Sequence, residues 1–529
     1  MVSPDTQPEF AASTEPPGPR DAGASMLKFA PGVVVLAIAL ADTWRFADAD
    51  TWGHVRFGQD VLAAGKIVWR DSYSYTAFGH LWLNHEWLAE VIMAVLYNRL
   101  GVFGLSLMKL ACVAITIVFI VKTEAETGAP PLIQIGVLIL TIASLNPQFQ
   151  YRPQLFTFAM LSALLYLLTR DAYRRPARLW ITVPMFALWA NLHGGFILGI
   201  AALWIFALTA GSQDLLGGRG ASRSTRLGAV AAIATVATLA TPYGIGTWTA
   251  VLRALANPYT RIMIQDWRPL GVQLLMCWRR SPLNGLNYDA AIVLMAALAL
   301  CFTLSRNWAD LPLMTIALVM SGAAFAANRN VPAAAIAIAA PLTRHLTLTV
   351  SRYWPRSGLM NDLPQLATRE ATVLLSAIAL ILSGRCGFYS TSLEAEYPYP
   401  VSACEFMRQN RLKGNILTQF HWGEFVIWQL APDSKVFIDG RYDTVYPPNV
   451  IDDFFRFNNG RPGGDAALTK YPTDFVLMDA SARVLMDHWG GWRLIYSDLA
   501  SVLYVRADSP AAKLPNLPIK GVAYVATFP

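Results

Sequence analysis

Arg45 to Arg56, RFADADTWGHVR, follows directly on the first strongly apolar segment of the chain, residues 27–41. The stretch therefore places two carboxylates, a histidine and two arginines at a predicted membrane boundary. Ionisable groups at such a position are costly unless they face water or a protein cavity, so the stretch is a candidate functional site. The alternative is a solvated loop in which one aspartate caps the helix that follows. The positions of the other polar clusters in the chain decide between the two.

The composition is that of a polytopic membrane protein. Of the 529 residues, 54% are hydrophobic and 15% are charged, and the mean hydropathy is +0.38. Soluble domains carry a larger charged fraction, about 25%. The net charge of +7 does not indicate nucleic acid, because arginines concentrated in short loops are what membrane orientation requires. We expect no nucleic acid among the partners.

Eleven apolar runs approach or reach the roughly 20 residues that cross a bilayer as a helix. They are residues 27–44, 102–121, 131–146, 153–169, 178–192, 195–210, 227–241, 288–305, 309–326, 331–348 and 370–384. The sequence therefore predicts a mainly α-helical, polytopic bundle of eleven transmembrane helices over residues 26–384. Residues 1–25, rich in Pro, Ala, Ser, Thr and Asp, are predicted to form a disordered cytoplasmic tail.

Arginines gather in three of the segments between these runs. The three groups are Arg170, Arg174, Arg175 and Arg178, then Arg219, Arg223 and Arg226, and finally Arg344, Arg352, Arg356 and Arg369. Because positively charged loops face the cytoplasm, eleven spans place the amino terminus inside and the carboxyl terminus outside. We expect the protein in the inner (cytoplasmic) membrane of a bacterium, with residues 385–529 in the periplasm.

The segments that this topology places outside also hold the unusual polar residues. They are Asp48, Asp50, His54 and Arg56, then His85 and Glu86, Arg152 and Gln154, His193, Asp266 and Arg268, and Arg329. Such one-sided clustering predicts a single extracytoplasmic cavity that these residues line. Simpler roles stay open for two of them: Arg152 as an arginine that snorkels to the interface, and His193 as a hydrogen-bonding residue at a helix end.

Two outer segments are expected to flank that cavity. The first outer loop, residues 43–101, contains a predicted helix that His85-Glu86 opens and that runs to about Leu100. Its tryptophan and tyrosine flanks favour a position in the membrane interface. The loop 242–287 has two arms rich in aromatic residues and arginines, which suit a cover over the cavity.

Residues 385–529 contain no spanning run, and short apolar strands alternate there with helical segments, which predicts a small extracytoplasmic α/β domain. Strands are expected at 414–417, 425–430, 435–439, 475–478, 492–497 and 502–506. Trp422, Asp439 and Arg441, in the segments WGEF and DGR, are candidate substrate contacts. An Asp-Gly pair that ends an apolar strand is also a common turn.

Outward-facing carboxylates beside a membrane, with arginines and histidines near them, suit a reaction on a lipid-linked substrate. A carboxylate can take the proton of an acceptor hydroxyl as general base. Arginine stabilises a phosphate leaving group through charge-assisted, bidentate hydrogen bonds. The chain has no Walker-type or Rossmann glycine motif. It also lacks a Gly-x-Ser-x-Gly elbow and a His-Glu-x-x-His motif, which argues against a serine hydrolase or a zincin.

The architecture resembles the GT-C superfamily of integral membrane glycosyltransferases. The resemblance rests on a first membrane helix, an acidic motif in a long first outer loop, many further spans and an extracytoplasmic carboxyl-terminal domain. The acidic motif matches Asp48 and Asp50, so the resemblance implies that one of them is the catalytic base or a metal ligand. It also implies a sugar linked to polyprenyl phosphate or polyprenyl diphosphate as donor.

The oligosaccharyltransferase branch of that superfamily adds a Trp-Trp-Asp-Tyr-Gly motif before a second Asp-Gly strand end. Trp422-Gly423-Glu424-Phe425 followed by Asp439-Gly440 is distantly similar to that arrangement. The paired tryptophans and the Asp-Tyr step are missing, so the resemblance does not extend to recognition of a peptide acceptor.

The combined hypothesis is a hexosyl- or pentosyltransferase that transfers a sugar, with inversion, at the outer membrane face. Asp48 or Asp50 activates the acceptor, and Asp48 is favoured because it is nearer the membrane helix. Arg152, His193 or Arg329 neutralises the departing lipid phosphate. The expected partners are the lipid-linked sugar donor, membrane lipid, and an acceptor that is a glycan, a lipid or a protein.

The cofactor and the function both have alternatives. A divalent cation is a candidate cofactor, since Asp48, Asp50, His54 and Glu86 offer hard or mixed ligands. A transporter or flippase would instead show polar or broken helices at mid-membrane depth. A non-catalytic assembly subunit would leave Asp48 and Asp50 exposed, with no cavity beneath them.

Overall fold

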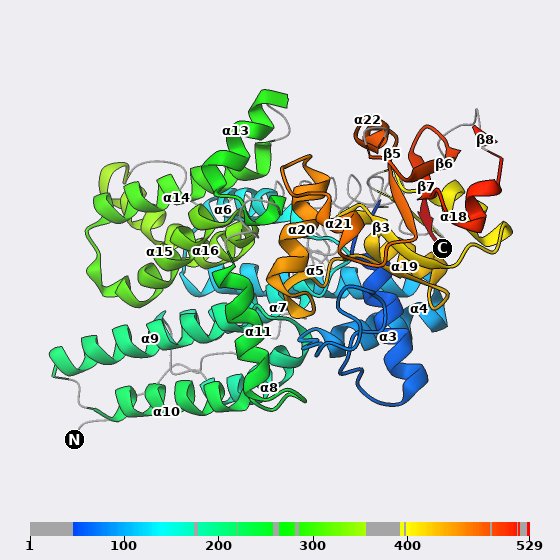
Figure 1. Ribbon diagram of the computed structural model, residues 1–529. Coiled ribbons are helices and arrows are strands. Elements are labelled where there is room, and N and C mark those ends of the chain that lie inside the picture. Colours follow the sequence, from blue (N-terminus) through cyan, green and yellow to red (C-terminus); the bar gives the residue numbers. More distant parts are fainter. Residues whose placement is uncertain are drawn as a thin grey trace, which may run out of the picture.

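The computed structural model describes residues 46–173, 178–218, 221–257, 264–280, 285–355, 392–395, 398–486, 489–515, 517–518 and 526–529. Figure 1 shows a bundle of helices and, beside it, a mixed α/β part built from the carboxyl-terminal residues. The predicted tail at 1–25 and the predicted membrane helices at 27–44 and 370–384 lie outside the described residues.

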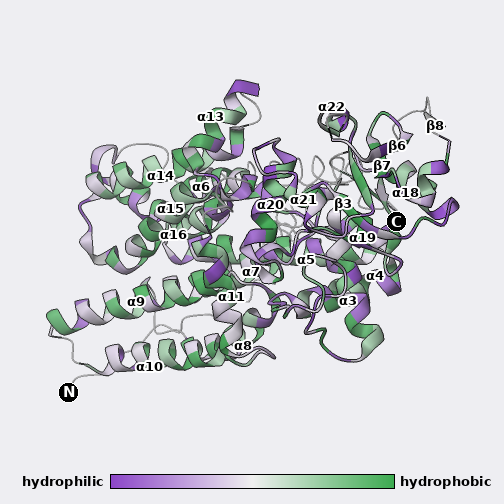
Figure 2. Ribbon diagram, viewed as in Figure 1, coloured by the Kyte–Doolittle hydropathy of each residue, from purple (hydrophilic) through white to green (hydrophobic). Residues whose placement is uncertain are grey.

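Apolar helices form the first part. Their bounds are α5 Val102–Glu126, α6 Pro131–Leu145, α7 Gln154–Tyr173, α8 Thr182–Leu192, α9 Phe196–Leu216, α10 Ser222–Ala237, α14 Leu286–Ser305, α15 Leu311–Ala326 and α16 Val331–Tyr353. Figure 2 shows hydrophobic residues along much of α9, α10, α14 and α15. Within the described residues six segments are long and apolar enough to cross a membrane: Val102–Glu126, Pro131–Gln148, Gln154–Tyr173, Phe196–Leu216, Leu286–Ser305 and Asn328–Tyr353. The protein is therefore an integral membrane protein with a mainly helical bundle.

The helix α16 lies at the centre of this bundle. It packs against α14, α15 and α6, and it also contacts α5 and α7. Every residue from Val331 to Thr343 is buried. Residues 333–340, AAAIAIAA, are mostly small, which lets the neighbouring helices approach closely. A helix that is apolar on all sides is expected in the interior of a bundle.

Nine of the eleven predicted membrane helices fall within the described residues, and each coincides with a helix. The runs at 178–192, 227–241 and 309–326 correspond to the shorter helices α8, α10 and α15. The helical bundle is thus confirmed, with six candidate spans among the described residues. The total of eleven spans and the orientation across the membrane stay predictions.

The first outer loop forms two helices, α3 (Thr51–Ala64) and α4 (Trp87–Leu100), which pack against each other. The helix α4 matches the one predicted after His85-Glu86, and it packs onward against α5. Gly58 permits the close crossing of α3 and α4, because a Cβ there would lie 2.1 Å from the backbone oxygen of Glu90.

The carboxyl-terminal part contains a six-stranded mixed sheet in the order β4-β3-β5-β7-β6-β8. The strands are β3 Gly414–Thr418, β4 Ser434–Val436, β5 Phe475–Asp479, β6 Trp492–Ser497, β7 Ser501–Arg506 and β8 Leu517–Pro518. Strands β4, β3 and β5 run parallel, and β7 is antiparallel to β5 and β6. The helices are α18 Val401–Gln409, α19 Gly423–Leu430, α20 Pro448–Asn458, α21 Ala466–Thr469 and α22 Arg483–Met486. The predicted α/β character of this region is confirmed.

The predicted strand at 425–430 is wrong, because these residues belong to α19. Most of α19 is buried, so its short apolar run has no polar face and is equally compatible with a buried strand. The strands β3 and β4 on either side of it are parallel neighbours. A parallel pair needs a crossover connection, and a helix is the usual one.

The acidic stretch is held in place by the carboxyl-terminal region. Strand β1 (Phe46–Ala47) pairs in parallel with β2 (Leu393–Ala395), which pairs antiparallel with β9 (Thr527–Phe528). The buried ring of Trp52, at the start of α3, packs against the rings of Phe425 and Phe528. Helix α3 also contacts α19, and the two lie side by side in Figure 1. Both backbone pairing and aromatic packing therefore fix the position of residues 46–52.

Candidate active site

Asp48 and Asp50 lie in the turn between β1 and α3. The backbone N–H of Asp50 donates to Asp48 Oδ1 at 3.0 Å. Asp50 occupies the N-cap position of α3, but its side chain makes no capping hydrogen bond. The Asp50 side chain therefore does not cap α3, in contrast to the alternative considered for this stretch.

Arg152 brings three carboxylates together around one guanidinium. Its Nε donates to Asp48 Oδ1, and its Nη2 lies 3.1 Å from Asp50 Oδ2. Its Nη1 lies 3.5 Å from Oδ2 of Asp266. Asp266 belongs to the predicted covering loop 242–287 and lies between its two helices, α11 (Ile245–Ala256) and α13 (Leu270–Arg280). We call Arg152 and these three aspartates the Arg152 group. Because it joins three separate segments, Arg152 is positioned by protein contacts, and lipid snorkelling does not explain its place.

The electrostatics of the Arg152 group favour a charged arginine beside an aspartate that gains a proton readily. Burial raises the pKa of Asp50, Arg152 opposes that shift, and the charge of Asp48 adds to it, so that the pKa of Asp50 is above its ordinary value. Burial alone would lower the pKa of Arg152, but the three carboxylates raise it well above its usual range. A carboxyl group poised in this way is suited to accept a proton during a reaction.

A second group of ionisable side chains lies where α3 meets α4. His54 Nδ1 lies 3.3 Å from Glu90 Oε1. Glu86 Oε1 lies 3.7 Å from His85 Nε2 and 3.5 Å from His193 Nε2. One ligand atom from each of His54, Glu86 and Glu90 lies within 4.8 Å of the other two. The geometry of this trio is that of a candidate metal site.

His193 is held in one tautomer. The backbone N–H of Gly195 donates to His193 Nδ1 at 3.0 Å, and the hydroxyl of Thr157 lies 2.8 Å from the same nitrogen. Because Nδ1 accepts a hydrogen bond, the neutral ring carries its proton on Nε2, which faces Glu86. Burial lowers the pKa of His193 to about 3. At neutral pH the ring therefore presents an uncharged N–H donor.

Arg329 is a cation beside the Arg152 group. Its guanidinium stacks over the ring of Trp267, 4.4 Å from the ring centroid. The segment that carries it, η6 (Asn328–Asn330), is hydrogen-bonded to η3 (Gln265–Trp267), which carries Asp266. Within the described part of the chain, no carboxylate forms an ion pair with Arg329. Its charge is therefore less neutralised than that of the arginine bound to three carboxylates.

Glu424 joins the site although the sequence marks only its segment, WGEF. A Cβ at Gly440 would lie 2.6 Å from Glu424 Oε1 and 2.7 Å from Asp50 Oδ1. A Cβ at Gly53 would lie 2.0 Å from Glu424 Oε2, so the two glycines leave the space in which the carboxyl groups approach each other. Burial, followed by the charges of Asp50 and Asp439, raises the pKa of Glu424 well above its usual range. Its Oε2 has no hydrogen-bond partner among the described residues.

Neither a protein-family model nor a curated protein matches the chain. The fold, in contrast, is similar to solved structures. An oligosaccharyltransferase from Archaeoglobus fulgidus, tethered to an acceptor peptide, aligns with a TM-score of 0.53 and 12% identity over 94% of this chain and 75% of that one. Arabinofuranosyltransferase AftD from Mycobacteria aligns with a TM-score of 0.51 and 14% identity over 91% of this chain and 40% of that longer one. ArnT from Cupriavidus metallidurans in the apo state aligns with a TM-score of 0.50 and 12% identity over 91% of this chain and 97% of that one.

The fold of the chain is therefore similar to that of these three structures. The predicted resemblance to GT-C glycosyltransferases is thus confirmed as a likeness of architecture over more than nine tenths of the chain. At 12–14% identity the likeness concerns the fold alone.

Three predicted site residues contact neighbours close by in the sequence instead of the Arg152 group. Arg56 Nε lies 3.0 Å from Oδ2 of Asp60, one helical turn later in α3. The Gln154 amide donates to a backbone carbonyl six residues earlier, at 3.0 Å. Arg268 Nη1 lies 3.5 Å from the Met276 sulfur. These contacts give the three side chains local partners.

Three further predicted residues, Trp422, Asp439 and Arg441, are buried in the carboxyl-terminal part. Trp422 Nε1 donates to the Pro398 carbonyl at 2.9 Å. Arg441 donates to both oxygens of Asp439, at 2.8 and 2.7 Å, and its Nη1 lies 2.7 Å from Asp71 Oδ1. Because Asp71 belongs to the predicted first outer loop, this buried ion group fastens that loop to the sheet.

Proposed function

We propose that the protein is a glycosyltransferase that moves a sugar from a polyprenyl-phosphate-linked donor to an acceptor at the extracytoplasmic membrane face. The observation that carries this proposal is the Arg152 group, in which the acidic pair of the first outer loop meets a half-buried arginine. The GT-C fold supports it, because two of the aligned structures, an oligosaccharyltransferase and an arabinofuranosyltransferase, are named as sugar transferases.

The general base in this proposal is Asp50. The sequence alone favours Asp48, because that residue is nearer the predicted membrane helix. Asp48 Oδ1 already accepts hydrogen bonds from Arg152 and from the backbone N–H of Asp50. An oxygen so engaged is a weak proton acceptor. Asp50 has a pKa that burial raises above its ordinary value, which strengthens it as a base. Asp48 then orients Arg152.

The reaction needs one proton acceptor and one stabilised leaving group. The acceptor hydroxyl gives its proton to Asp50 while its oxygen forms a bond to the anomeric carbon of the sugar. The bond between that carbon and the phosphate oxygen breaks, and the lipid phosphate leaves with the electron pair. We assign charge stabilisation of the phosphate to Arg329, because it forms no ion pair among the described residues, whereas Arg152 is bound to carboxylates. His193, neutral at its Nε2–H, contributes a hydrogen bond and no charge.

A divalent cation fits the trio of His54, Glu86 and Glu90. Their donor atoms lie within 4.8 Å of one another, and one imidazole with two carboxylates suits Zn²⁺ or Mn²⁺. This set retains His54 and Glu86 from the predicted ligands, whereas Asp48 and Asp50 are held by Arg152. A cation bound there would supply additional positive charge for the phosphate.

Metal analysis tests the trio directly. We expect purified protein to carry a divalent metal that EDTA removes, and Glu90→Gln to lose metal binding. Transfer should fall on metal removal and return when the metal is added back. Full transfer by protein shown to be metal-free would contradict this part of the proposal.

Substitution of the acidic pair tests the proposed function. Asp50→Asn should lower transfer by about a hundredfold or more in vesicles supplied with radiolabelled polyprenyl-phosphate sugars, the contribution typical of a general base. Asp48→Asn should also lower transfer, by releasing Arg152. Asp433→Asn is the matched control, because that carboxylate is 61% exposed and pairs with an exposed lysine. Retained transfer in both site variants, at normal protein levels, would refute the proposal.

A further inference from the structure

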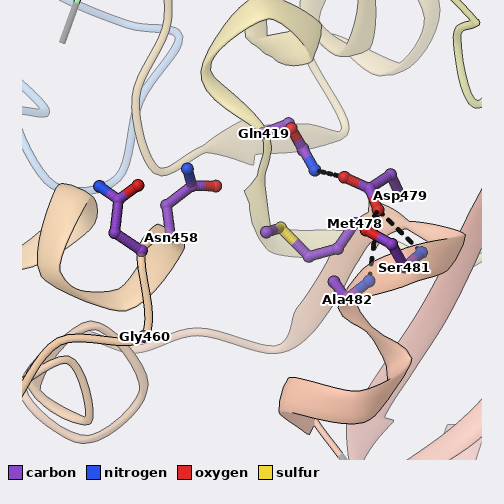
Figure 3. A pocket seen from close by; sticks show the side chains of 8 residues that line it. Gln419, Asn458, Gly460, Met478, Asp479, Ser481 and Ala482 are labelled. Carbon is purple, nitrogen blue, oxygen red and sulfur yellow. Dashed lines mark hydrogen bonds between the residues drawn. The ribbon is translucent and has the colours of Figure 1, made fainter.

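A polar pocket of about 380 Å³ lies in the carboxyl-terminal part, and none of its lining residues belongs to the Arg152 group (Figure 3). It opens where two parallel strands end: Gln419 follows β3, and Asp479 is the last residue of β5. Asn458 and Asn459, at the end of α20, line another side. The volume lies in the range of roughly 300–1,000 Å³ that is typical of small-molecule sites.

The pocket lies at a topological switch point of the sheet. Strand β3 leads through α19 to its parallel neighbour β4, whereas β5 leads through α22 towards β6 and β7 on its other side. The connections that leave β3 and β5 therefore diverge, and a crevice forms between the two strand ends. Ligands of open α/β sheets bind in such crevices, outside the carboxyl ends of the strands.

The lining chemistry favours an uncharged ligand that bears hydroxyl groups. The amides of Gln419, Asn458 and Asn459 line the pocket. An amide presents a donor and an acceptor side by side, which matches the donor and acceptor character of neighbouring hydroxyls. Among the described residues that line the pocket there is no lysine, arginine or histidine, so none of them is a cation that could bind a phosphate.

Asp479 is the ionisable residue of the pocket lining, and its carboxylate already accepts hydrogen bonds from other lining residues. Its carboxylate accepts hydrogen bonds from the Gln419 amide, from the backbone N–H of Ser481 at 2.8 Å and from that of Ala482 at 3.2 Å (Figure 3). The Gln419 amide nitrogen is therefore fixed, and its carbonyl oxygen is available to a ligand. The Asn458 side chain is half-buried, and Figure 3 shows no hydrogen bond between it and the other lining residues drawn.

We propose that this pocket binds a neutral sugar unit of a glycan, whose ring hydroxyls donate to the Gln419 carbonyl oxygen and form hydrogen bonds with the Asn458 side-chain amide. Met478 supplies an apolar surface in the same pocket. Such binding goes beyond the transfer reaction and does not depend on it. The chain that leaves the pocket at Gln419 runs through η8 (Phe420–Trp422) into α19, which carries Glu424. A glycan bound in this pocket would therefore contact the segment that leads directly into α19, the helix that carries Glu424 of the candidate active site.

Ligand-detected NMR on the full-length protein in nanodiscs, without any lipid-linked donor, tests the proposal. The probes are neutral methyl glycosides of glucose, galactose, mannose and arabinose, with inorganic phosphate as the anionic comparison. We expect saturation transfer to at least one glycoside and about tenfold weaker binding in Gln419→Ala and in Asn458→Ala, as for the loss of one or two hydrogen bonds. Asn449→Ala, an exposed position on the same helix, is the matched control with unchanged binding.

Three results would overturn the proposal: no saturation transfer from any glycoside at millimolar concentration, unchanged affinity in both pocket variants, or preferential binding of phosphate. Unfolding midpoints equal to that of the unmodified protein verify that the variants fold. Because neither donor nor transfer enters the measurement, failure of the proposed transferase activity would leave this result standing.

Discussion

Glu424 shows how far the site depends on residues that are distant in sequence. It reaches Asp50 through the space that Gly53 and Gly440 leave open. Sequence reasoning finds Asp50 because the residue follows an apolar run, and ionisable groups are costly there. No comparable local pattern marks Glu424, because an acidic residue in a short apolar helix has the same sequence signature whether it faces solvent or a second carboxyl group.

Replacement of Glu424 by glutamine probes this carboxyl pair. The folded-state pKa of Glu424 is raised, so the stability that its protonated form contributes is complete below the ordinary pKa and is lost as pH rises through the folded pKa. We expect Glu424→Gln, a neutral residue of similar shape, to weaken the loss of thermal stability on going to alkaline pH. The measurement is the unfolding midpoint of both proteins across the pH range.

The same pH dependence in Glu424→Gln and in the unmodified protein would contradict a protonated Glu424. Gly440→Ala provides the contrast, because its Cβ would overlap oxygens of both Glu424 and Asp50. We expect that substitution to destabilise the protein at every pH.

At the scale of elements, long apolar segments were predictable and short connections were not. The nine described membrane runs coincide with helices because length and hydropathy suffice to identify them. The segment 425–430 is a helix because of its place between two parallel strands, which is tertiary information. The pairing of β1 with β2 involves two residues per strand, and so short a pairing leaves no periodic pattern in a sequence.

The arm formed by α11 contacts the carboxyl-terminal part at η9 (Tyr442–Thr444), where the Asn257 amide donates to Asp443. Burial raises the pKa of Asp443 to about 6 from an ordinary value of 3.8. The stability contributed by its protonated form is therefore complete below about pH 4 and is lost as pH rises through about 6. We expect hydrogen exchange of the α11 amides to quicken over that range, measured by mass spectrometry.

Asp443→Asn should make exchange in α11 independent of pH over this range, after correction for the intrinsic exchange rate. Asp433→Asn, on the same part of the protein but exposed, should retain the dependence. If Asp443→Asn retains it as well, another group is responsible.

A large hydrophobic core extends through both the helical part and the carboxyl-terminal part among the described residues. The same cluster of buried residues contains Ile117 of α5, Leu161 of α7 and Leu503 of β7. Composition and hydropathy predict the membrane class and the α/β part, because both follow from the pattern of apolar residues. The joining of the two parts was not predictable, since it depends on single side chains such as Trp52 and Arg441. A fold similar to those of the aligned structures at only 12–14% identity fits the tolerance of hydrophobic cores to substitutions that keep volume and pattern.

Substitution of Phe528 tests how much the packing between the helical part and the carboxyl-terminal part contributes to stability. It is fully buried, and its ring packs against Trp52, Tyr97 and Trp428 at centroid distances of 5.8, 5.1 and 5.3 Å. We expect Phe528→Ala to destabilise the protein by about 3–5 kcal/mol, as for other large cavities in cores. Thermal or denaturant unfolding in detergent measures the effect. Phe325→Ala, at a position 52% exposed in the helical part, is the control, and an equally small effect at both positions would contradict the prediction.

The three-stranded sheet β1-β2-β9 also imposes an order on biogenesis. Strand β1 precedes the acidic pair, whereas β2 and β9 come from segments that a ribosome adds only after the helical bundle. Domains generally fold from the amino-terminal side during synthesis. Here, however, β1 can pair only after β2 has been synthesised, and the sheet is complete only after β9 has been synthesised. Asp48 and Asp50 therefore acquire their final surroundings only when the nascent chain has delivered its distant end to them. If the proposed transfer depends on these two residues, a half-made polypeptide already inserted in the membrane would be inactive until its assembly is complete.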